Sequence, residues 1–333
     1  MERSNSFDEL RLILALIVVV AHLGALTQLP SIQIVSQYFD SEFAVKCFFV
    51  ISGYFVLKSF IDNPLLFSYF RKRVNRIYPA YIFVVVITFL VGFSNVGLSF
   101  SDYVFSNETV RYFLANSVFL NFIQPSVHNV FKDNPMSNFN GAFWTLKVEV
   151  MFYILVPIIA IAIKSAGYKL VLSVAYLFGV IWSLIFSEYD SRLAHQLPGQ
   201  MAYFAVGMFF VYFDVNRLNH YWFWVAIISY FCLPIPHYLE VMLSPVVYGG
   251  VIFLVGQSTL IRTKITQLGD FSYSIYLIHY PIIQFSVSFG LFESGVWFGF
   301  TITMLLVFCL ASFIWFLIER PFIRSKKFLG LIK

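Results

Sequence analysis

Apolar runs of about twenty residues, each long enough to cross a bilayer as a helix, recur along this chain between short polar segments. Hydrophobic residues make up 59% of the 333 residues, and the mean hydropathy is +0.79, which exceeds what a single soluble core uses. The runs do not alternate like the strands of a membrane barrel, and only helices satisfy such a backbone in lipid. The sequence therefore predicts an all-α, polytopic integral membrane protein.

We expect about ten transmembrane helices, because each run is long enough to span the hydrocarbon core. The first run contains His22 and is followed by no small-residue cleavage site, so it is expected to be a retained span and not a signal peptide. A single transmembrane domain is expected over 1–333, with no appended soluble domain. The expected spans lie near 10–29, 42–60, 79–98, 142–163, 168–186, 198–214, 220–236, 241–260, 271–290 and 296–317.

The distribution of basic residues predicts the orientation of these spans. An even number of spans places both termini on one side, and positively charged loops favour the cytoplasm. With both termini cytoplasmic, 17 of the 22 Lys and Arg residues lie on the cytoplasmic side. The other five are Lys46, Arg111, Lys132, Lys147 and Arg192. The net charge of +5 is therefore explained by the topology, and the basic loops could also attract anionic membrane lipid as a partner. No nucleic-acid patch is expected.

Two further features of the sequence bear on its local structure. The piece 112–123, within the long interruption from 99 to 140, is short for a crossing and is expected to form a re-entrant or interfacial helix on the outer side. The three cysteines are widely separated within or beside apolar runs, a pattern that predicts neither a disulfide framework nor a metal site.

The first expected helix carries two polar groups on one face. Arg11 stands at its polar entrance, and His22 follows eleven residues later in an otherwise apolar run. Eleven residues rotate about 1100°, roughly 20° from three full turns, so both side chains project in the same direction. His22 then lies roughly 16 Å deeper than Arg11, where an ionisable group is costly and usually functional. The alternative is a core histidine satisfied by a neighbouring hydroxyl or carbonyl.

A carboxylate enters the membrane with the fourth expected span. Glu149 stands about two turns inside the helix start, and Lys147 lies two residues before it on a different face. This arrangement suits a polar site. Alternatively, Lys147 extends to the surface and Glu149 pairs with a basic residue of another helix only to hold the bundle.

Another polar stripe opens the ninth expected span. Ser272, Tyr276 and His279 recur at helical spacing, and Pro281 follows and is expected to kink the helix. Such a stripe can be plain interhelical hydrogen bonding. A second histidine at membrane depth, together with His22, favours a lined cavity instead.

Three shorter motifs complete the set. Ser52 and Gly53 allow either close approach of two helix backbones or room for a ligand. The basic cluster of Arg71, Lys72, Arg73 and Arg76 is expected in a cytoplasmic loop closed by Pro79, where it serves as an orientation signal or clamps a phosphate ligand. The closing Glu319-Arg-Pro321 lies at a helix end, where a salt bridge is the expected purpose.

These residue types suit two kinds of function. A neutral histidine at membrane depth can act as a general base in transferring a group from a phosphorylated donor to a hydroxyl. A proton-coupled transporter or a flippase of a glycan-related solute would use the same residues, although no inverted repeat is visible. The residues alone do not separate the enzyme from the transporter.

The chain resembles the acyltransferase-3 family of polytopic membrane O-acyltransferases over nearly its whole length. The resemblance rests on the order and spacing of motifs taken together: Arg11 with ten residues between it and His22, Phe48-Phe-Val-Ile-Ser-Gly53, Arg73 and Arg76 before Pro79, Trp144-Thr-Leu-Lys-Val-Glu149, Tyr273-Ser-Ile-Tyr-Leu-Ile-His279 and Glu319-Arg-Pro321. It implies an enzyme that moves an acyl group, most often acetyl, from cytoplasmic acyl-CoA to an extracytoplasmic or lipid-linked glycan. It also implies a multi-pass protein of the bacterial inner membrane, with acetyl-CoA as donor and no metal.

The resemblance further implies a role for each matching residue. His22 and Glu149 are expected to be catalytic, and Glu149 is expected to line the acceptor side. Lys147 stands where relatives often have a small residue and is expected to mark a subgroup's acceptor preference. The remaining expected contacts are the donor contacts Arg11, Arg71, Arg73 and Arg76, and the acceptor and pocket-wall contacts Trp144, Tyr276 and His279.

Overall fold

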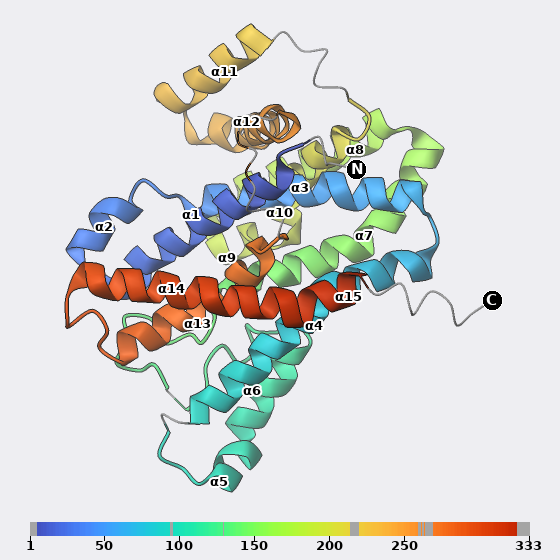
Figure 1. The fold of residues 1–333 in the computed structure, drawn as a ribbon. Helices are drawn as coiled ribbons and strands as arrows, with labels where there is room; N and C mark the ends of the chain where they lie inside the picture. The colour runs from blue at the N-terminus through green and yellow to red at the C-terminus, as the bar shows by residue number, and fades with distance from the viewer. Residues whose placement is uncertain are drawn as a thin grey trace. The chain divides into compact units, whose positions relative to one another are not determined.

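The structure is a computed structural model that describes residues 5–93, 96–128, 130–213, 220–258, 261, 263 and 269–324. These residues form helices and no strand, as Figure 1 shows, so the all-α prediction is confirmed for them. The elements are α1 (Phe7–Thr27), α2 (Pro30–Ser36), α3 (Ser41–Asp62), α4 (Leu66–Gly92), α5 (Phe100–Phe105), α6 (Asn107–Ser117), the 3-10 turn η2 (Gly141–Phe143), α7 (Trp144–Ala166), α8 (Tyr168–Tyr189), α9 (Ser191–Ala194), α10 (Leu197–Phe209), α11 (His220–Cys232), α12 (His237–Gln257), α13 (Ser272–Ser288), α14 (Val296–Ile314), the π-helical turn η5 (Trp315–Glu319) and α15 (Arg320–Arg324).

Seven helical segments among the described residues are long and apolar enough to cross a membrane, so the chain is a multi-pass membrane protein. They are Phe7–Thr27, Pro30–Asp62, Leu66–Gly92, Gly141–Ala166, Tyr168–Tyr189, His237–Gln257 and Val296–Arg324. The other three expected spans correspond to α10, α11 and α13, of 13, 13 and 17 residues. At 1.5 Å per residue these are shorter than a hydrocarbon core of about 30 Å. The count of ten and the cytoplasmic termini stay predictions, and Arg3, Arg217, Arg262, Lys264, Lys326, Lys327 and Lys333 lie outside the described residues.

The prediction of a loop around Arg71 to Arg76 was wrong. Helix α4 runs without a break from Leu66 to Gly92 and includes Pro79. A proline inside a helix removes a single backbone donor, and membrane helices tolerate the loss because neighbouring groups satisfy the freed carbonyl. Helix α13 likewise continues through Pro281.

The segment between α4 and α7 has a small apolar core of its own. Helix α6 has 11 residues, too few to cross a bilayer, and begins before the predicted position because the Ser106 side chain accepts a hydrogen bond from the Thr109 amide and caps it. One α6 side chain and four from outside this helix form the buried core, which consists of Tyr103, Tyr112, Val127, Phe131 and Phe139. A re-entrant or interfacial position of this segment stays a prediction.

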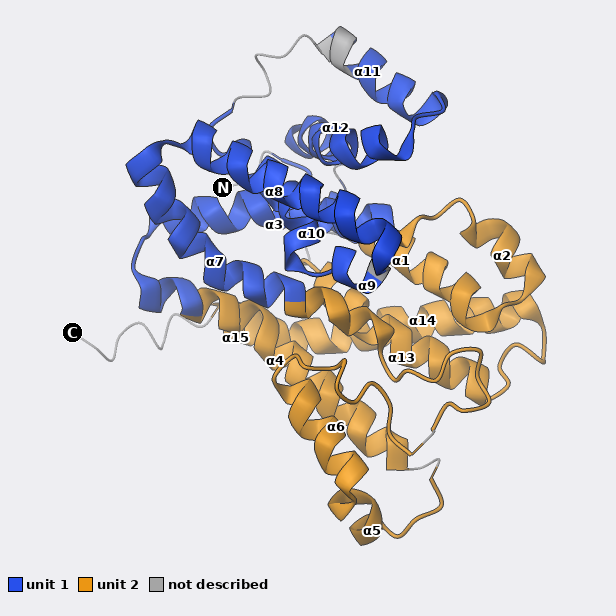
Figure 2. Ribbon diagram, turned by 180° about the vertical axis from the view of Figure 1, so that it is seen from behind, with its two compact units in different colours: residues 1–14, 42–70, 148–264 blue, residues 15–41, 71–147, 265–333 orange. Residues whose placement is uncertain are grey.

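The chain divides into two compact units, coloured in Figure 2. Unit 1 comprises residues 1–14, 42–70 and 148–264, and unit 2 comprises residues 15–41, 71–147 and 265–333. The expectation of one transmembrane domain over 1–333 stays a prediction.

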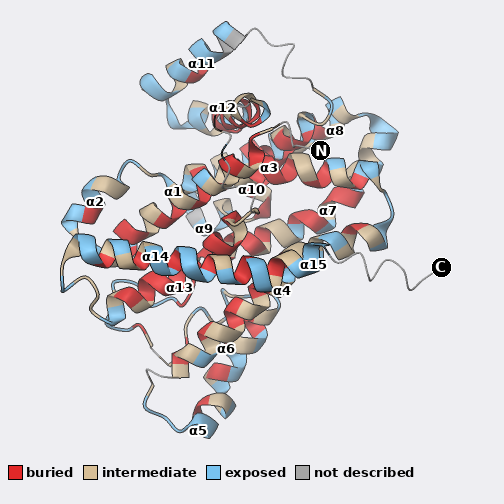
Figure 3. Ribbon diagram, viewed as in Figure 1, coloured by how far each residue is buried: buried red, intermediate tan, exposed pale blue. Residues whose placement is uncertain are grey.

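Small residues bring helices together inside unit 1, where Figure 3 shows buried positions along α3 and α10. A Cβ added to Gly53 on α3 would lie 2.4 Å from the Phe204 carbonyl oxygen, and one added to Gly207 on α10 would lie 2.0 Å from that of Val50. The two backbones therefore approach as closely as glycine permits, which confirms the expectation for Gly53.

Unit 2 is organised around the buried helix α13. Its first turn follows Gly269, which has a φ of +151°, and a Cβ there would lie 2.1 Å from Nε1 of Trp315 in η5. Only glycine fits this position, so the N-terminal end of α13 is held against η5. This packing positions the polar stripe of α13 within unit 2.

Candidate active site

A pair of histidines lies at the centre of the candidate site in unit 2. The His22 Nδ1 and the His279 Nε2 are 3.0 Å apart, and the rings stack with centroids 5.1 Å apart. His279 is fully buried, whereas His22 is half-buried. The Tyr280 ring meets His22 edge-on at 5.3 Å. The two histidines singled out in the sequence are therefore direct neighbours.

The surroundings of His279 indicate which nitrogens carry hydrogen. Its Nδ1 lies 2.8 Å from the Tyr276 carbonyl oxygen and 3.2 Å from that of Ile275. Carbonyl oxygens only accept, so Nδ1 of His279 is the protonated nitrogen, and in the neutral ring its Nε2 is an acceptor. His22 then donates from Nδ1 to His279, which leaves the lone pair of neutral His22 on Nε2. This arrangement can take a proton from a substrate at one defined atom.

Hydrogen bonds to η2 and the start of α7 hold the α13 stripe in place. The Tyr276 hydroxyl lies 2.7 Å from the Thr145 hydroxyl and 3.2 Å from the Ala142 carbonyl oxygen. The Asn140 side chain donates to the Leu277 carbonyl oxygen at 2.9 Å. The polar groups at 140–145 and the α13 stripe are thus brought together in unit 2.

Trp144 and Lys147, two predicted acceptor-side residues at the start of α7, are half-buried. The Lys147 ammonium lies 4.7 Å from the centroid of the Phe122 ring, over its face, so this charge contacts an aromatic surface. The roles predicted for Trp144, Lys147, Tyr276 and His279 stay predictions.

A second polar network joins α4, the start of α13 and η5 inside unit 2. Arg76 lies 2.5 Å from an Asp270 carboxylate oxygen and 3.5 Å from a Glu319 carboxylate oxygen. Glu319 is 1% exposed and also accepts a hydrogen bond from the Ser274 hydroxyl. Tyr273 donates to the Ile77 carbonyl oxygen at 2.9 Å, and Arg76 faces its ring. The predicted salt bridge at the Glu319 motif is present, and its partner is Arg76.

Two more of the predicted phosphate contacts, Arg71 and Arg73, lie on α4 with Arg76. Arg73 and Arg76 are one turn apart on α4, while Arg71 lies about 200° around the helix from Arg73. Around the helix axis, the side chain of Arg73 therefore points more nearly in the direction of Arg76 than in that of Arg71. Both Arg71 and Arg73 are half-buried. The contact of Arg71 and Arg73 with the donor stays a prediction.

Two predicted site residues belong to unit 1. The Glu149 Oε1 accepts hydrogen bonds from the Tyr153 hydroxyl at 2.5 Å and from the Ser52 hydroxyl at 3.3 Å. Arg11 lies 3.3 Å from an Asp8 carboxylate oxygen, and its guanidinium faces the Phe55 ring at 4.7 Å. Glu149 is therefore a half-buried carboxylate held by two hydroxyls, and Arg11 is held at the start of α1.

Sequence reasoning missed three residues of these networks. Asp270, Asn140 and Tyr280 were not singled out, although Asp270 directly precedes the polar stripe and Tyr280 follows His279 in the chain. Asp270 could have been recognised, because a carboxylate near the N-terminus of a helix interacts favourably with the helix dipole. Among the described residues no group of three His, Cys, Asp or Glu gathers as metal ligands.

Comparisons with known proteins give the family. The family model described as "Acyltransferase domain" matches residues 4–319. The O-acetyl transferase of Shigella phage Sf6 is 26% identical, over 99% of this chain and 100% of the relative. Nodulation protein 10 of Rhizobium leguminosarum bv. viciae is 27% identical, over 95% of this chain and 92% of the relative. No solved structure matches the chain significantly. The chain therefore belongs to the acyltransferase-3 family and is a multi-pass membrane acyltransferase.

Proposed function

We propose that this protein transfers an acetyl group from acetyl-CoA to a hydroxyl of an extracytoplasmic or lipid-linked glycan, with His22 as general base. The observation that carries the proposal is the pairing of half-buried His22 with fully buried His279. The relative from phage Sf6, which is named an O-acetyl transferase, supports acetyl as the transferred group. We place this reaction at the bacterial inner membrane as part of the same proposal.

In this reaction His22 acts through Nε2. It takes the proton of the acceptor hydroxyl as that oxygen attacks the thioester carbonyl, and the tetrahedral intermediate forms. The carbon–sulfur bond then breaks, and the imidazolium returns the proton to the leaving thiolate, so the products are the acetyl ester and CoA. His279 orients the base through the bond to Nδ1, as a buried hydrogen-bond acceptor does for a catalytic imidazole.

The remaining predicted residues are assigned by charge and position. Arg11, Arg71 and Arg73 are proposed to bind the phosphates of acetyl-CoA, because guanidinium groups match phosphate oxygens. Trp144, Lys147, Tyr276 and Glu149 are proposed to line the acceptor side. Arg76 was predicted as a donor contact, but its two carboxylate partners favour a role as a structural brace. Membership of an acyltransferase family favours this enzyme over the transporter or flippase alternative.

The test is acetyl transfer by membranes that contain the protein. Membranes are incubated with radiolabelled acetyl-CoA and surface polysaccharide, and label in the polysaccharide is counted. We expect His22→Ala to lower the rate by about 10²–10⁴-fold, the usual contribution of general acid–base catalysis. His128→Ala, at a histidine outside the proposed site, is the matched control and should keep the rate. Undiminished transfer by a stably inserted His22→Ala protein would overturn the proposal.

A further inference from the structure

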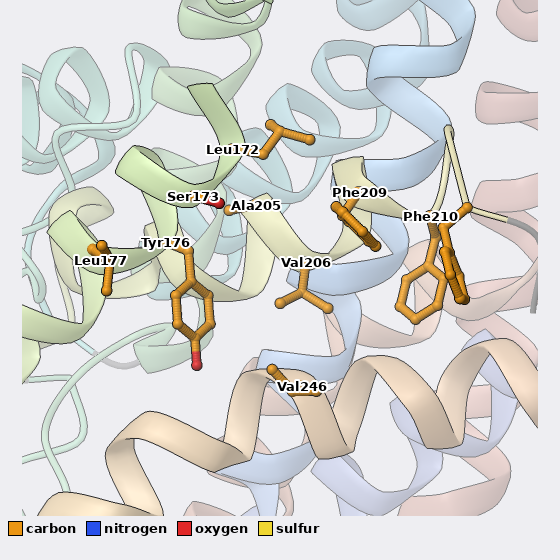
Figure 4. A pocket seen from close by; sticks show the side chains of 10 residues that line it. Leu172, Ser173, Tyr176, Leu177, Ala205, Val206, Phe209, Phe210 and Val246 are labelled. Carbon is orange, nitrogen blue, oxygen red and sulfur yellow. The ribbon is translucent and has the colours of Figure 1, made fainter. Parts of the chain in front are cut away.

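Unit 1 contains a cavity that the proposed reaction does not use. It has a volume of about 440 Å³ and lies between α8, α10 and α12, as Figure 4 shows. Its walls are mostly hydrocarbon, from side chains that include Leu172, Val206, Phe209, Phe210, Phe213 and Val246. This size falls within the range of about 300–1,000 Å³ that is typical of ligand pockets.

The chemistry of the walls excludes a polar occupant. Two hydroxyl groups line the cavity, those of Ser173 and Tyr176. The Tyr176 hydroxyl already donates to the Met242 carbonyl oxygen of α12. A sugar or a nucleotide would therefore lose its hydrogen bonds to water and gain few in return. The occupant must be largely hydrocarbon.

The cavity opens on a face of α8 that meets lipid. Ser173 and Leu177 line the cavity and are also exposed, so the cavity reaches the exposed face of this helix, where its mouth is placed. Helix α8 is one of the membrane-spanning segments, and its exposed residues around the mouth, such as Val174 and Phe178, are apolar. Lipid acyl chains are therefore the medium that reaches the mouth.

Groups suited to a lipid head group lie one turn from the mouth. Helix α8 begins at Tyr168, so the first lining residue, Leu172, is about 6 Å below the helix start. Tyr168 stacks on Tyr212 with centroids 4.5 Å apart, which is the aromatic arrangement found at membrane interfaces. Lys169 is exposed and precedes Ser173 by one turn on the same helical face.

A second cation lies close by in the chain. Lys164 is exposed in the last turn of α7, four residues before α8 begins. The turn between the two helices therefore carries two ammonium groups near the level of the head groups, where each attracts anionic lipid.

We propose that the cavity binds one acyl chain of an anionic phospholipid whose phosphate is held by Lys169 and Lys164. In the predicted topology this turn faces the cytoplasm, the side on which anionic lipids attract basic segments. A lipid-linked glycan presented on the outer side would have its head group at the opposite surface. The proposal stands on unit 1 alone and does not depend on the chemistry of His22.

Native mass spectrometry of the purified protein tests the site. The protein is mixed with phosphatidylglycerol or phosphatidylcholine of identical acyl chains, and the retained adducts are compared. Wild-type protein should retain phosphatidylglycerol preferentially. Ser173→Phe, which fills the mouth, should reduce the adduct about tenfold, a loss of roughly 1.4 kcal/mol. Ile181→Phe, at an exposed position of α8 one turn beyond the lining residue Leu177, is the matched control and should bind as wild type does.

The head-group arm uses charge reversal. Lys169→Glu should reduce phosphatidylglycerol binding about fivefold, as expected for one basic residue at an anionic surface. Phosphatidylcholine binding should fall less, because the choline cation balances the charge of its phosphate. Lys132→Glu, at an exposed position in unit 2, is its control. Equal binding of both lipids by wild type, or unchanged binding by Ser173→Phe, would overturn the proposal.

A photoreactive phosphatidylglycerol locates the acyl chain independently of protein stability. With a diazirine near the chain terminus, crosslinks should map to peptides from α8, α10 and α12. Crosslinks confined to other helices would contradict the proposal, as would displacement of the lipid by a polyprenyl-linked glycan at equal concentration.

Discussion

The hydrogen position on His22 is determined by His279, so the two rings are coupled. The carbonyl oxygens of Tyr276 and Ile275 require a hydrogen on Nδ1 of His279, and this requirement passes through the 3.0 Å contact to His22. The backbone of α13 thus determines that the lone pair of neutral His22 lies on Nε2. A histidine without such a neighbour would distribute its hydrogen over both nitrogens.

The role of His279 as a positioning residue gives a prediction. His279→Leu removes the acceptor for Nδ1 of His22 and should lower kcat roughly 10–100-fold, the range found when the orienting partner of a histidine ligand is lost. His279→Gln can place a carbonyl oxygen near the former Nε2 and should recover part of the loss. The KM for acetyl-CoA should stay unchanged in both variants, because His279 is fully buried.

Kinetics on purified protein measure this prediction. A substrate contact at His279 would raise the KM for the acceptor in both variants. A purely structural role would lower thermal stability without any recovery by glutamine. Either pattern contradicts the positioning role.

At the scale of elements, the network of Arg76 joins three helical segments that are distant in the sequence. It connects α4, Asp270, which lies two residues before α13, and the π-helical turn η5. Glu319 is 1% exposed, so the charge of its carboxylate depends on Arg76 and on the Ser274 hydroxyl for compensation. π-helical turns are rare and are frequently found at functional sites. Here the turn ends at Glu319 itself.

This arrangement predicts that Arg76 contributes to stability more than to donor binding. Arg76→Met should destabilise the protein by about 3–5 kcal/mol, because it leaves a buried carboxylate without its charge partner. Adding Glu319→Gln should recover part of that loss, since the neutral amide needs no cation. The thermal unfolding midpoint in detergent measures both effects. Arg324→Met, at an exposed arginine of α15, is the control.

The opposite result would return Arg76 to the donor site. If Arg76→Met unfolds at the temperature of the wild type but raises the KM for acetyl-CoA, the guanidinium binds phosphate as the sequence suggested. The double variant then gives no recovery.

Local sequence patterns predicted the elements better than the contacts between them. Apolar runs place the long helices because their length and hydropathy are local properties. Pro79 was misread as the end of a loop, since a proline signals a break unless tertiary contacts and the membrane compensate. The polar faces of His22 and His279 were visible, but their contact joins positions 257 residues apart, which helical periodicity does not encode. The partners of Arg76 were missed for the same reason.

For the whole molecule, the basic residues and the apolar segments together determine how the chain inserts. Of the seven segments long enough to cross, several are flanked by charges on one predicted side, such as Lys164 and Lys169 between α7 and α8. The segment from Phe100 to Phe139 has its own aromatic core and carries Arg111 and Lys132 on the other predicted side. The proposed transfer reaction needs this asymmetry, because its proposed donor is cytoplasmic and its proposed acceptor is not.

Cysteine labelling in intact cells tests this orientation. Lys132→Cys and Lys164→Cys are placed separately in a variant without Cys47, Cys232 and Cys309, and cells are treated with a membrane-impermeant maleimide. Both positions are exposed, so access depends on the side of the membrane. We expect Lys132→Cys to react in cells with a permeabilised outer membrane and Lys164→Cys to react only after lysis, because positively charged turns stay in the cytoplasm. The cysteine-free parent is the control for background. Reaction of Lys164→Cys before lysis, with Lys132→Cys protected, would reverse the topology and place the lysines of the proposed lipid site on the outer surface.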